Sequence, residues 1–216
     1  MPHSSLEQIY SQHHAHARGR NFVLLGRERG AFLRSQVGTG KQVLDVGCRD
    51  GELTQLYAAG NTVTGYDIDG EALAIAEQKI PGFTGMHVDL NGEWPAAPAS
   101  FDVVVACEVL EHLYYPDVVM EKIERVLKPG GLLAGTIPHA FSLQSRIKLL
   151  FGVKTGTPLQ DPTHINQFSY REFKGLLEAR FTDVRVVGLT SRRYALFARV
   201  APYLFAHTLL FSARKR

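Results

Sequence analysis

Short apolar runs alternate with amphipathic stretches along most of this chain. The runs at 43–46, 63–69, 83–89 and 101–107 have the length and side chains of buried strands, and a fifth strand opens at Leu132. Apolar residues recur at helical spacing between these runs, at Leu73, Ala76 and Ile80 and again at Val119, Met120, Ile123, Val126 and Leu127. Strands and helices that alternate in this way predict a parallel, doubly wound α/β sheet.

Two segments lie outside this alternation. Residues 4–36 have the pattern of two helices, so we expect an N-terminal helical cap over residues 1–40 and a main domain over residues 41–216. An insert at about 140–168 follows the fifth strand and fits either a mobile lid or a core-facing helix with a surface loop. These segments are the parts of the chain that we expect to shape an acceptor pocket.

The C-terminal region continues the alternation. Ser169 and Glu172 form the S-x-x-E capping box ahead of an apolar helical run, which predicts a helix start at this point. Residues 183–189 and 208–213 then supply two further strands for the end of the sheet. With 216 residues, of which 45% are hydrophobic, the chain can bury a substantial core in one domain.

A glycine turn follows the first strand. Gly47 and Gly51 remove side chains where the backbone turns sharply, and Asp45 lies inside the strand. The G-x-G-x-x-G fingerprint of dinucleotide sites is absent, and Asp45 would repel a pyrophosphate. Its charge suits instead the amino and sulfonium groups of S-adenosylmethionine. The second strand ends in acidic residues: the carboxylate of Asp67 can accept both ribose hydroxyls, while Asp69 is placed to cap the next helix.

The residues after the fourth strand complete a family pattern. The sequence Glu-Val-Leu-Glu-His at 108–112 follows that strand, and together with the acidic glycine turn it resembles the class I S-adenosylmethionine-dependent methyltransferases. Arg49 departs from the family by replacing the middle glycine, so either its backbone tolerates a Cβ or its guanidinium lies over the cofactor carboxylate. The resemblance implies a Rossmann-like sheet of seven strands with the last antiparallel. It also implies cofactor contacts from Asp45, Gly47, Cys48, Arg49, Gly51, Asp67, Ile68, Asp89, Leu90 and Cys107.

Methyl transfer to a hydroxyl is the reaction that we expect, by in-line displacement at the sulfonium methyl. A hydroxyl acceptor benefits from a general base, and histidine is suited to that role near neutral pH. His139 is the first candidate because it emerges at the carboxyl edge after strand five. His112 is the second, with a structural hydrogen bond as its alternative role. Nitrogen and carbon acceptors remain open at this stage.

Other side chains near this edge are candidates for acceptor binding. His164 lies in a loop before the capped helix, where it fits a role in binding the acceptor or in anchoring the loop. The remaining candidates follow strands four and five and could instead pack between helices: Tyr114, Tyr115, Phe141 and Arg146.

Two other functions are alternatives to methyl transfer. Parts of the insert resemble MetW-type proteins, a branch of the same superfamily associated with methionine biosynthesis. That resemblance is weaker and suggests a methyltransferase-fold module that binds a partner acyltransferase. A nicotinamide dehydrogenase would have the right sheet but the wrong glycine spacing.

Charge and cysteine usage limit partners and location. Residues 141–216 hold 13 basic and 4 acidic residues, a net charge of about +9, which fits an anionic small-molecule acceptor or a solvated basic face. No nucleic-acid-binding module accompanies this charge, so we expect no nucleic-acid partner. Two cysteines and the lack of a signal-peptide pattern favour a reducing, cytoplasmic location.

Metal binding and membrane insertion are not expected from the sequence. The N-terminal histidines His13, His14 and His16 lack matching ligands at metal-site spacing. The apolar stretch at 194–213 is interrupted by Arg199, so a membrane-spanning helix is not expected there.

Overall fold

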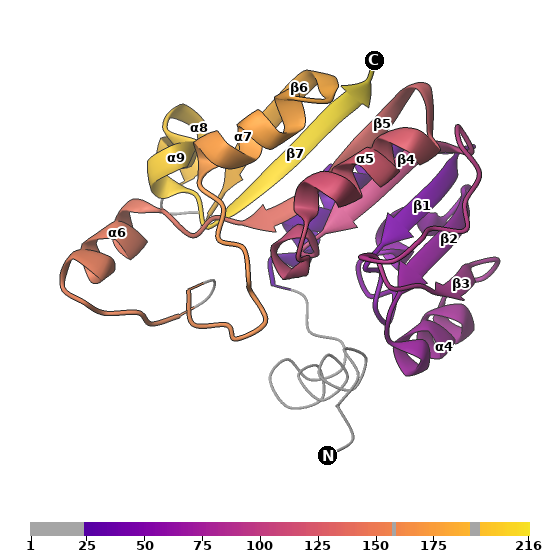
Figure 1. Ribbon diagram of the computed structural model, residues 1–216, viewed down its shortest axis with the longest axis horizontal. Helices are drawn as coiled ribbons and strands as arrows, with labels where there is room; N and C mark the ends of the chain where they lie inside the picture. Colours follow the sequence, from indigo (N-terminus) through magenta and orange to yellow (C-terminus); the bar gives the residue numbers. More distant parts are fainter. Residues whose placement is uncertain (1–23, 157–158, 191–194) are drawn as a thin grey trace.

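The computed structural model describes residues 24–156, 159–190 and 195–216, which are built around one sheet (Figure 1). Seven strands form this sheet in the order β3-β2-β1-β4-β5-β7-β6. They are β1 Gln42–Val46, β2 Thr62–Asp67, β3 Thr84–His87, β4 Phe101–Cys107, β5 Leu127–Pro138, β6 Phe181–Leu189 and β7 Thr208–Lys215. β7 is antiparallel to both β5 and β6, whereas the other neighbours pair in parallel. The expected mostly parallel sheet with an antiparallel last strand is confirmed.

Helices cover both faces of the sheet. The described helices are α2 Gly26–Val37, α3 Gln55–Ala58, α4 Gly70–Lys79, the 3₁₀ helix η2 Leu110–His112, α5 Pro116–Val126, α6 Leu143–Leu150, α7 Tyr170–Glu178, α8 Ala195–Val200 and α9 Pro202–Phe205. Val104 of β4 packs in one apolar cluster with Met120 of α5 and Phe173 of α7. Its neighbour Val103 belongs to a second cluster with Leu33 of α2. Because successive strand residues point to opposite faces, the two clusters are the cores of a doubly wound sheet.

A strand and two helix caps that the local sequence predicts are present in the structure. β4 has the bounds that its apolar run predicts. The Asp69 side chain caps α4 by accepting from the N–H of Ala72 at 3.1 Å. At α7 both hydrogen bonds of the capping box between Ser169 and Glu172 are present. These signals act within a few residues, so the surrounding fold does not override them.

Some elements differ from expectation. The regular helix after the glycine turn begins only at Gln55, because residues 52–54 form turns. α6 forms within the expected insert, yet none of its residues is buried, so the core-facing alternative is wrong. Leu150 and the adjoining Phe151 are 81% and 76% exposed. Figure 1 shows α6 extending away from the sheet, which explains why its apolar side chains do not reach the core.

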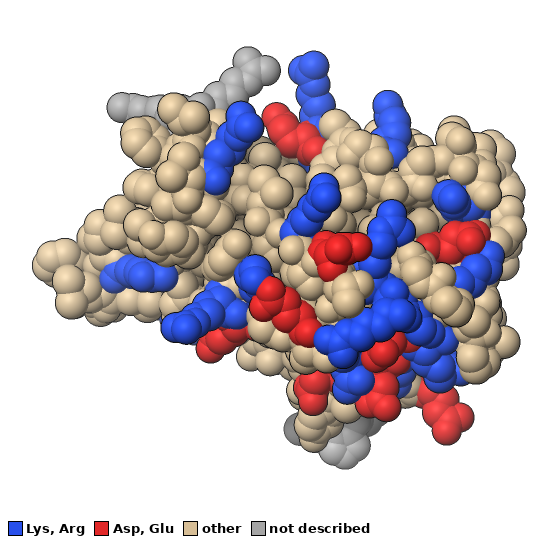
Figure 2. Space-filling model, turned by 90° about the horizontal axis from the view of Figure 1, so that it is seen from above, with Lys and Arg blue, Asp and Glu red and all other residues tan. Residues whose placement is uncertain are grey.

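The surface carries mixed charge. Over one half of the face in Figure 2, Lys and Arg alternate with Asp and Glu, and the other half is mostly uncharged. α2 is the part of the expected N-terminal cap that the structure describes; Gly19 and the three N-terminal histidines lie outside the described residues. Among the helices described, none is both long and apolar enough to cross a membrane.

Candidate active site

The carboxyl ends of β1, β2 and β4 lie side by side, because β1 pairs in parallel with both neighbours. These strand ends and the loops that leave them carry most of the residues expected to bind a cofactor. Open α/β sheets bind ligands in this position, just outside the carboxyl ends of the strands. The fold therefore brings together residues that lie far apart in the sequence.

The glycine turn has a left-handed backbone at three positions. Gly47, Arg49 and Gly51 have φ angles of 73°, 50° and 72°. A Cβ at Gly47 would lie 2.6 Å from Cγ2 of Val109, so this position requires glycine. Arg49 adopts the conformation that favours glycine, at a cost of about 1–2 kcal/mol. Its N–H donates to Oδ2 of Asp67 at 2.8 Å, and this bond stabilises the family-like turn despite the substitution.

Asp67 links the glycine turn to the end of β2. Its Oδ2 accepts from the N–H of Arg49, and its Oδ1 accepts from the N–H of Asp69 at 2.9 Å. Burial raises the pKa of the Asp67 carboxyl above its ordinary value, and these two hydrogen bonds oppose the shift. Each carboxylate oxygen can accept a further hydrogen bond. Asp67 can therefore hold the turn and accept from two neighbouring hydroxyl groups.

Asp45 is a buried carboxylate one strand away. The hydroxyl groups of Thr54 and Tyr57 both donate to its Oδ2, at 2.6 and 2.5 Å. Burial raises the pKa of Asp45 to about 6, against the effect of these hydrogen bonds, and the charge of nearby Asp67 adds to the rise. A bound cation would favour ionisation of both carboxylates. Thr54 and Tyr57 were missed in the sequence because neither belongs to a recognisable motif.

Arg29 is a second residue that the sequence did not reveal. It reaches from α2 to the end of β4 and is buried. Its Nη1 donates to the carbonyl of Leu24 at 3.3 Å, and its Nη2 lies 3.9 Å from Oε1 of Glu108. Its Nε has no hydrogen-bond partner among the described residues. A buried guanidinium with an unsatisfied N–H is suited to bind an anion such as a carboxylate.

The remaining predicted cofactor residues lie around these groups. Ile68 is half-buried beside Asp67, and Leu90 is buried after β3. Asp89 lies next to Leu90 and accepts from the N–H of Asn91 at 2.9 Å, which stabilises the turn there. Both cysteines are free thiols, and burial raises the pKa of each. They are therefore uncharged small side chains in this site.

His139 directly follows β5 and is buried. Its Nδ1 lies 3.1 Å from the carbonyl oxygen of Ala206, so Nδ1 carries the proton and Nε2 is the acceptor. Nε2 has no hydrogen-bond partner among the described residues. Burial lowers the pKa of His139, and the positive charge of Arg146 adds to this effect. The side chain is thus neutral near pH 7 and able to accept a proton.

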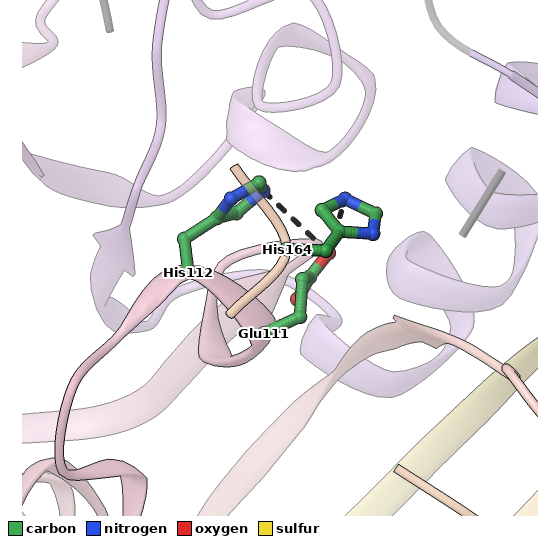
Figure 3. Close-up of side chains that lie close together, drawn as sticks. All are labelled: Glu111, His112 and His164. Carbon is green, nitrogen blue, oxygen red and sulfur yellow. Dashed lines mark ion pairs between the residues drawn. The ribbon is translucent and has the colours of Figure 1, made fainter. Parts of the chain in front are cut away.

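Glu111, His112 and His164 form a compact cluster, shown in Figure 3. Nδ1 of His112 lies 2.9 Å from the carbonyl oxygen of Thr163, which confirms a structural hydrogen bond for this histidine. The two imidazole rings meet edge to face with centroids 4.7 Å apart. His164 is contributed by the insert, so the cluster fixes the insert against the segment that follows β4.

The other candidates for acceptor binding are more dispersed. Tyr114 and Tyr115 are exposed beyond η2. Arg146 is exposed, and its guanidinium donates to the carbonyl oxygens of Phe141 and Tyr203 at 2.8 and 3.4 Å. Arg146 thus ties α6 to α9. These contacts give Arg146 a structural role and leave its part in acceptor binding a prediction.

The sheet topology defines an α/β protein of the Rossmann-like class. Residues 44–135 match the family model of a methyltransferase domain. The chain is 42% identical over 98 residues to a ubiquinone biosynthesis O-methyltransferase of Paraburkholderia phymatum, covering 43% of this chain and 42% of that protein. It is 32% identical over 153 residues to a probable S-adenosylmethionine-dependent methyltransferase of Mycobacterium tuberculosis, covering 70% of this chain and 52% of that protein.

A solved structure agrees with these relatives in fold. Phosphoethanolamine N-methyltransferase 2 of Haemonchus contortus, in complex with S-adenosyl-L-methionine, aligns with a TM-score of 0.68 and 22% identity over 91% of this chain and 54% of that chain. The sequence matches make the chain similar to S-adenosylmethionine-dependent methyltransferases over 43–70% of its length. The chain spans about half the length of the curated relatives that it matches.

Proposed function

We propose that this chain transfers the methyl group of S-adenosylmethionine to a hydroxyl oxygen of a small molecule. One observation supports this proposal above the others. Two buried carboxylates, at the ends of β1 and β2, and one buried guanidinium, at the end of β4, have charges that complement the parts of this cofactor. Asp45 suits its ammonium group, Asp67 its ribose hydroxyls and Arg29 its carboxylate.

The unsatisfied polar groups of these residues also fit the cofactor. The Nε of Arg29 has no hydrogen-bond partner among the described residues, and burial raises the pKa of both carboxylates. A ligand with an anionic group, a cationic group and two neighbouring hydroxyls would satisfy Arg29, Asp45 and Asp67 at once. Arg29 belongs to none of the sequence motifs, yet it supplies the positive charge that the cofactor carboxylate needs.

The proposed reaction needs alignment and removal of one proton. When bound, the cofactor supplies an activated methyl group whose leaving group is a neutral thioether. The acceptor oxygen forms a bond to the methyl carbon, the bond from that carbon to sulfur breaks, and the hydroxyl proton passes to a base. We assign the base to His139, because its Nε2 is an acceptor with a lowered pKa. The insert at about 140–168 and the N-terminal segment would shape the acceptor pocket.

Oxygen as the acceptor atom is supported by relatives named as ubiquinone biosynthesis O-methyltransferases. Matched acceptor pairs test it, in which a phenol and the corresponding aniline differ only at the reacting atom. Formation of S-adenosylhomocysteine should be at least about 10-fold faster with the phenol. Faster reaction of the aniline would contradict oxygen transfer while leaving the cofactor assignment intact.

Arg29→Met is expected to weaken S-adenosylhomocysteine binding by at least about 10-fold, because a charge-assisted hydrogen bond contributes about 1.5–3 kcal/mol. Binding of 5′-methylthioadenosine should change much less, because this ligand lacks the amino-acid end of the cofactor. Calorimetric titration with both ligands measures the difference. Equal losses for the two ligands would show that Arg29 supports the fold of the site and does not bind the carboxylate.

Affinity for S-adenosylhomocysteine is expected to fall as the pH drops through the pKa of Asp45, which is about 6. Protonation removes the negative charge that faces the ligand ammonium, so binding at about pH 5 should be roughly 10-fold weaker than at about pH 7.5. In Asp45→Asn, affinity should be low at both pH values and this dependence should flatten. An unchanged pH dependence in the variant would rule out Asp45 as its source.

The partner-module alternative is favoured by one observation. α6 has no buried residue, and nearby α8 exposes Leu196 and Val200. Exposed apolar side chains of this kind are typical of surfaces that bind other molecules. A partner module would associate stably with another protein and show no turnover with any acceptor, so the phenol and aniline assay also separates the two functions.

A further inference from the structure

The Glu111–His112–His164 cluster joins two distant segments of the chain. Glu111 and His112 end η2, just beyond the carboxyl end of β4, whereas His164 lies in the loop before α7. The N–H of Asn166 donates to the carbonyl oxygen of Glu111 at 2.9 Å, and Nδ1 of His112 lies 2.9 Å from the carbonyl oxygen of Thr163. Backbone bonds on both sides therefore hold the three side chains together.

The three side chains bring their potential metal-binding atoms close together. The Nε2 atoms of His112 and His164 lie 3.8 and 3.9 Å from Oε1 of Glu111. These distances are too long for hydrogen bonds. Two ligands of one tetrahedral zinc ion, each about 2.1 Å from it, lie about 3.4 Å apart. The ligand atoms of all three residues lie within 4.8 Å of one another, so side-chain shifts of about 0.5–1.4 Å would bring every pair to that spacing.

The tautomer of His112 also fits a ligand. Its Nδ1 donates its proton to a backbone carbonyl, so Nε2, which faces Glu111, is the nitrogen that would bind a metal once deprotonated. Metal-binding histidines commonly make this second hydrogen bond, because it fixes the tautomer and the ring orientation. Figure 3 shows the Glu111 carboxylate where the dashed lines from both imidazole rings meet. The Glu111 side chain is only 1% exposed.

We propose that Glu111, His112 and His164 bind one divalent transition-metal ion, with zinc as the best match. Two imidazole nitrogens and one carboxylate oxygen suit Zn²⁺ or Mn²⁺ better than Mg²⁺ or Ca²⁺, which prefer oxygen ligands. Three protein ligands leave a coordination position for water or an acceptor oxygen. Binding of the acceptor oxygen, which rests on the proposed function, would lower the pKa of its hydroxyl and assist loss of its proton.

The test uses the full chain, freed of metal by dialysis against a chelator. Zinc is titrated in competition with a coloured chelator, and we expect one ion per chain. Glu111→Gln and His164→Gln should each weaken binding by at least about 10-fold. His207→Gln is the matched control, because this exposed histidine lies outside the cluster, and it should bind zinc as the natural chain does.

A variant with His13, His14 and His16 replaced by Gln should also retain the ion. Loss of zinc in this variant, equal affinity in His164→Gln, or no zinc binding at all would each overturn the proposal. If a cluster variant does not fold, X-ray absorption of the zinc-loaded natural chain decides: two imidazole ligands support the site, and none rejects it. S-adenosylhomocysteine titration of the same samples separates a failed metal site from a failed methyltransferase assignment.

Discussion

Asp67→Ala is expected to weaken S-adenosylhomocysteine binding by at least about 100-fold. The carboxylate is placed to accept two ribose hydroxyls, and the loss of two charge-assisted hydrogen bonds costs about 3 kcal/mol or more. The substitution also releases the N–H of Arg49, whose left-handed conformation Asp67 stabilises. Calorimetric titration of the purified variant measures the loss.

Ligand choice distinguishes the role of Asp67 from that of Arg29. 5′-Methylthioadenosine keeps the ribose and lacks the amino-acid end, so Asp67→Ala should weaken its binding as strongly as that of S-adenosylhomocysteine. Asp117→Ala, which changes an exposed acid at the start of α5, is the matched control and should leave both affinities unchanged. Undiminished affinity in a folded Asp67→Ala chain would show that the ribose binds elsewhere.

His139→Asn is expected to lower kcat by about 100-fold to 10,000-fold, the usual contribution of general acid–base catalysis. Affinity for S-adenosylhomocysteine should change little, because His139 lies beyond β5 and the expected cofactor residues follow β1, β2, β3 and β4. The lowered pKa of His139 adds a second expectation. The midpoint of the rise of kcat with pH in the natural chain should lie below the ordinary histidine pKa of about 6.5, and this step should be absent in the variant.

His207→Asn is the matched control for this experiment, because His207 is exposed and its backbone carbonyl already accepts from the N–H of His139. The control should keep its kcat and its pH step, which should move only slightly upward because the charge of His207 contributes to the lowered pKa of His139. A folded His139→Asn chain with nearly normal kcat would exclude His139 as the base. The cluster of Glu111, His112 and His164 would then be the next place to look for proton transfer.

Much of the fold could be predicted from the sequence because its signals are local. The apolar run at 101–107 has the bounds of β4, and the Asp69 cap and the Ser169 capping box act within one helical turn. Parallel pairing then places the ends of β1, β2 and β4 together, so the grouping of Asp45 with Asp67 follows from topology. In these cases the neighbours of a residue follow from its local sequence or from the pairing of parallel strands.

The parts that escaped prediction depend on contacts between distant segments. Arg29 reaches Glu108 only because α2 packs over the end of β4, and no motif marks it. His164 meets Glu111 because the insert folds back, which its spacing does not encode. The apolar face of α6 would suit a core, yet the helix extends away from the sheet. Apolar periodicity predicts a helix, whereas its neighbours are set by tertiary structure.

Transfer of an isotopically labelled methyl group tests the central claim most directly. The full chain is incubated with cofactor labelled at the methyl carbon and with a pool of small hydroxylated metabolites, and magnetic resonance identifies the atom that receives the label. We expect the label in a methoxy group with the natural chain and none with Asp67→Ala. If the cofactor binds but no metabolite in a broad pool receives the label, the result would contradict methyl transfer and favour the partner module.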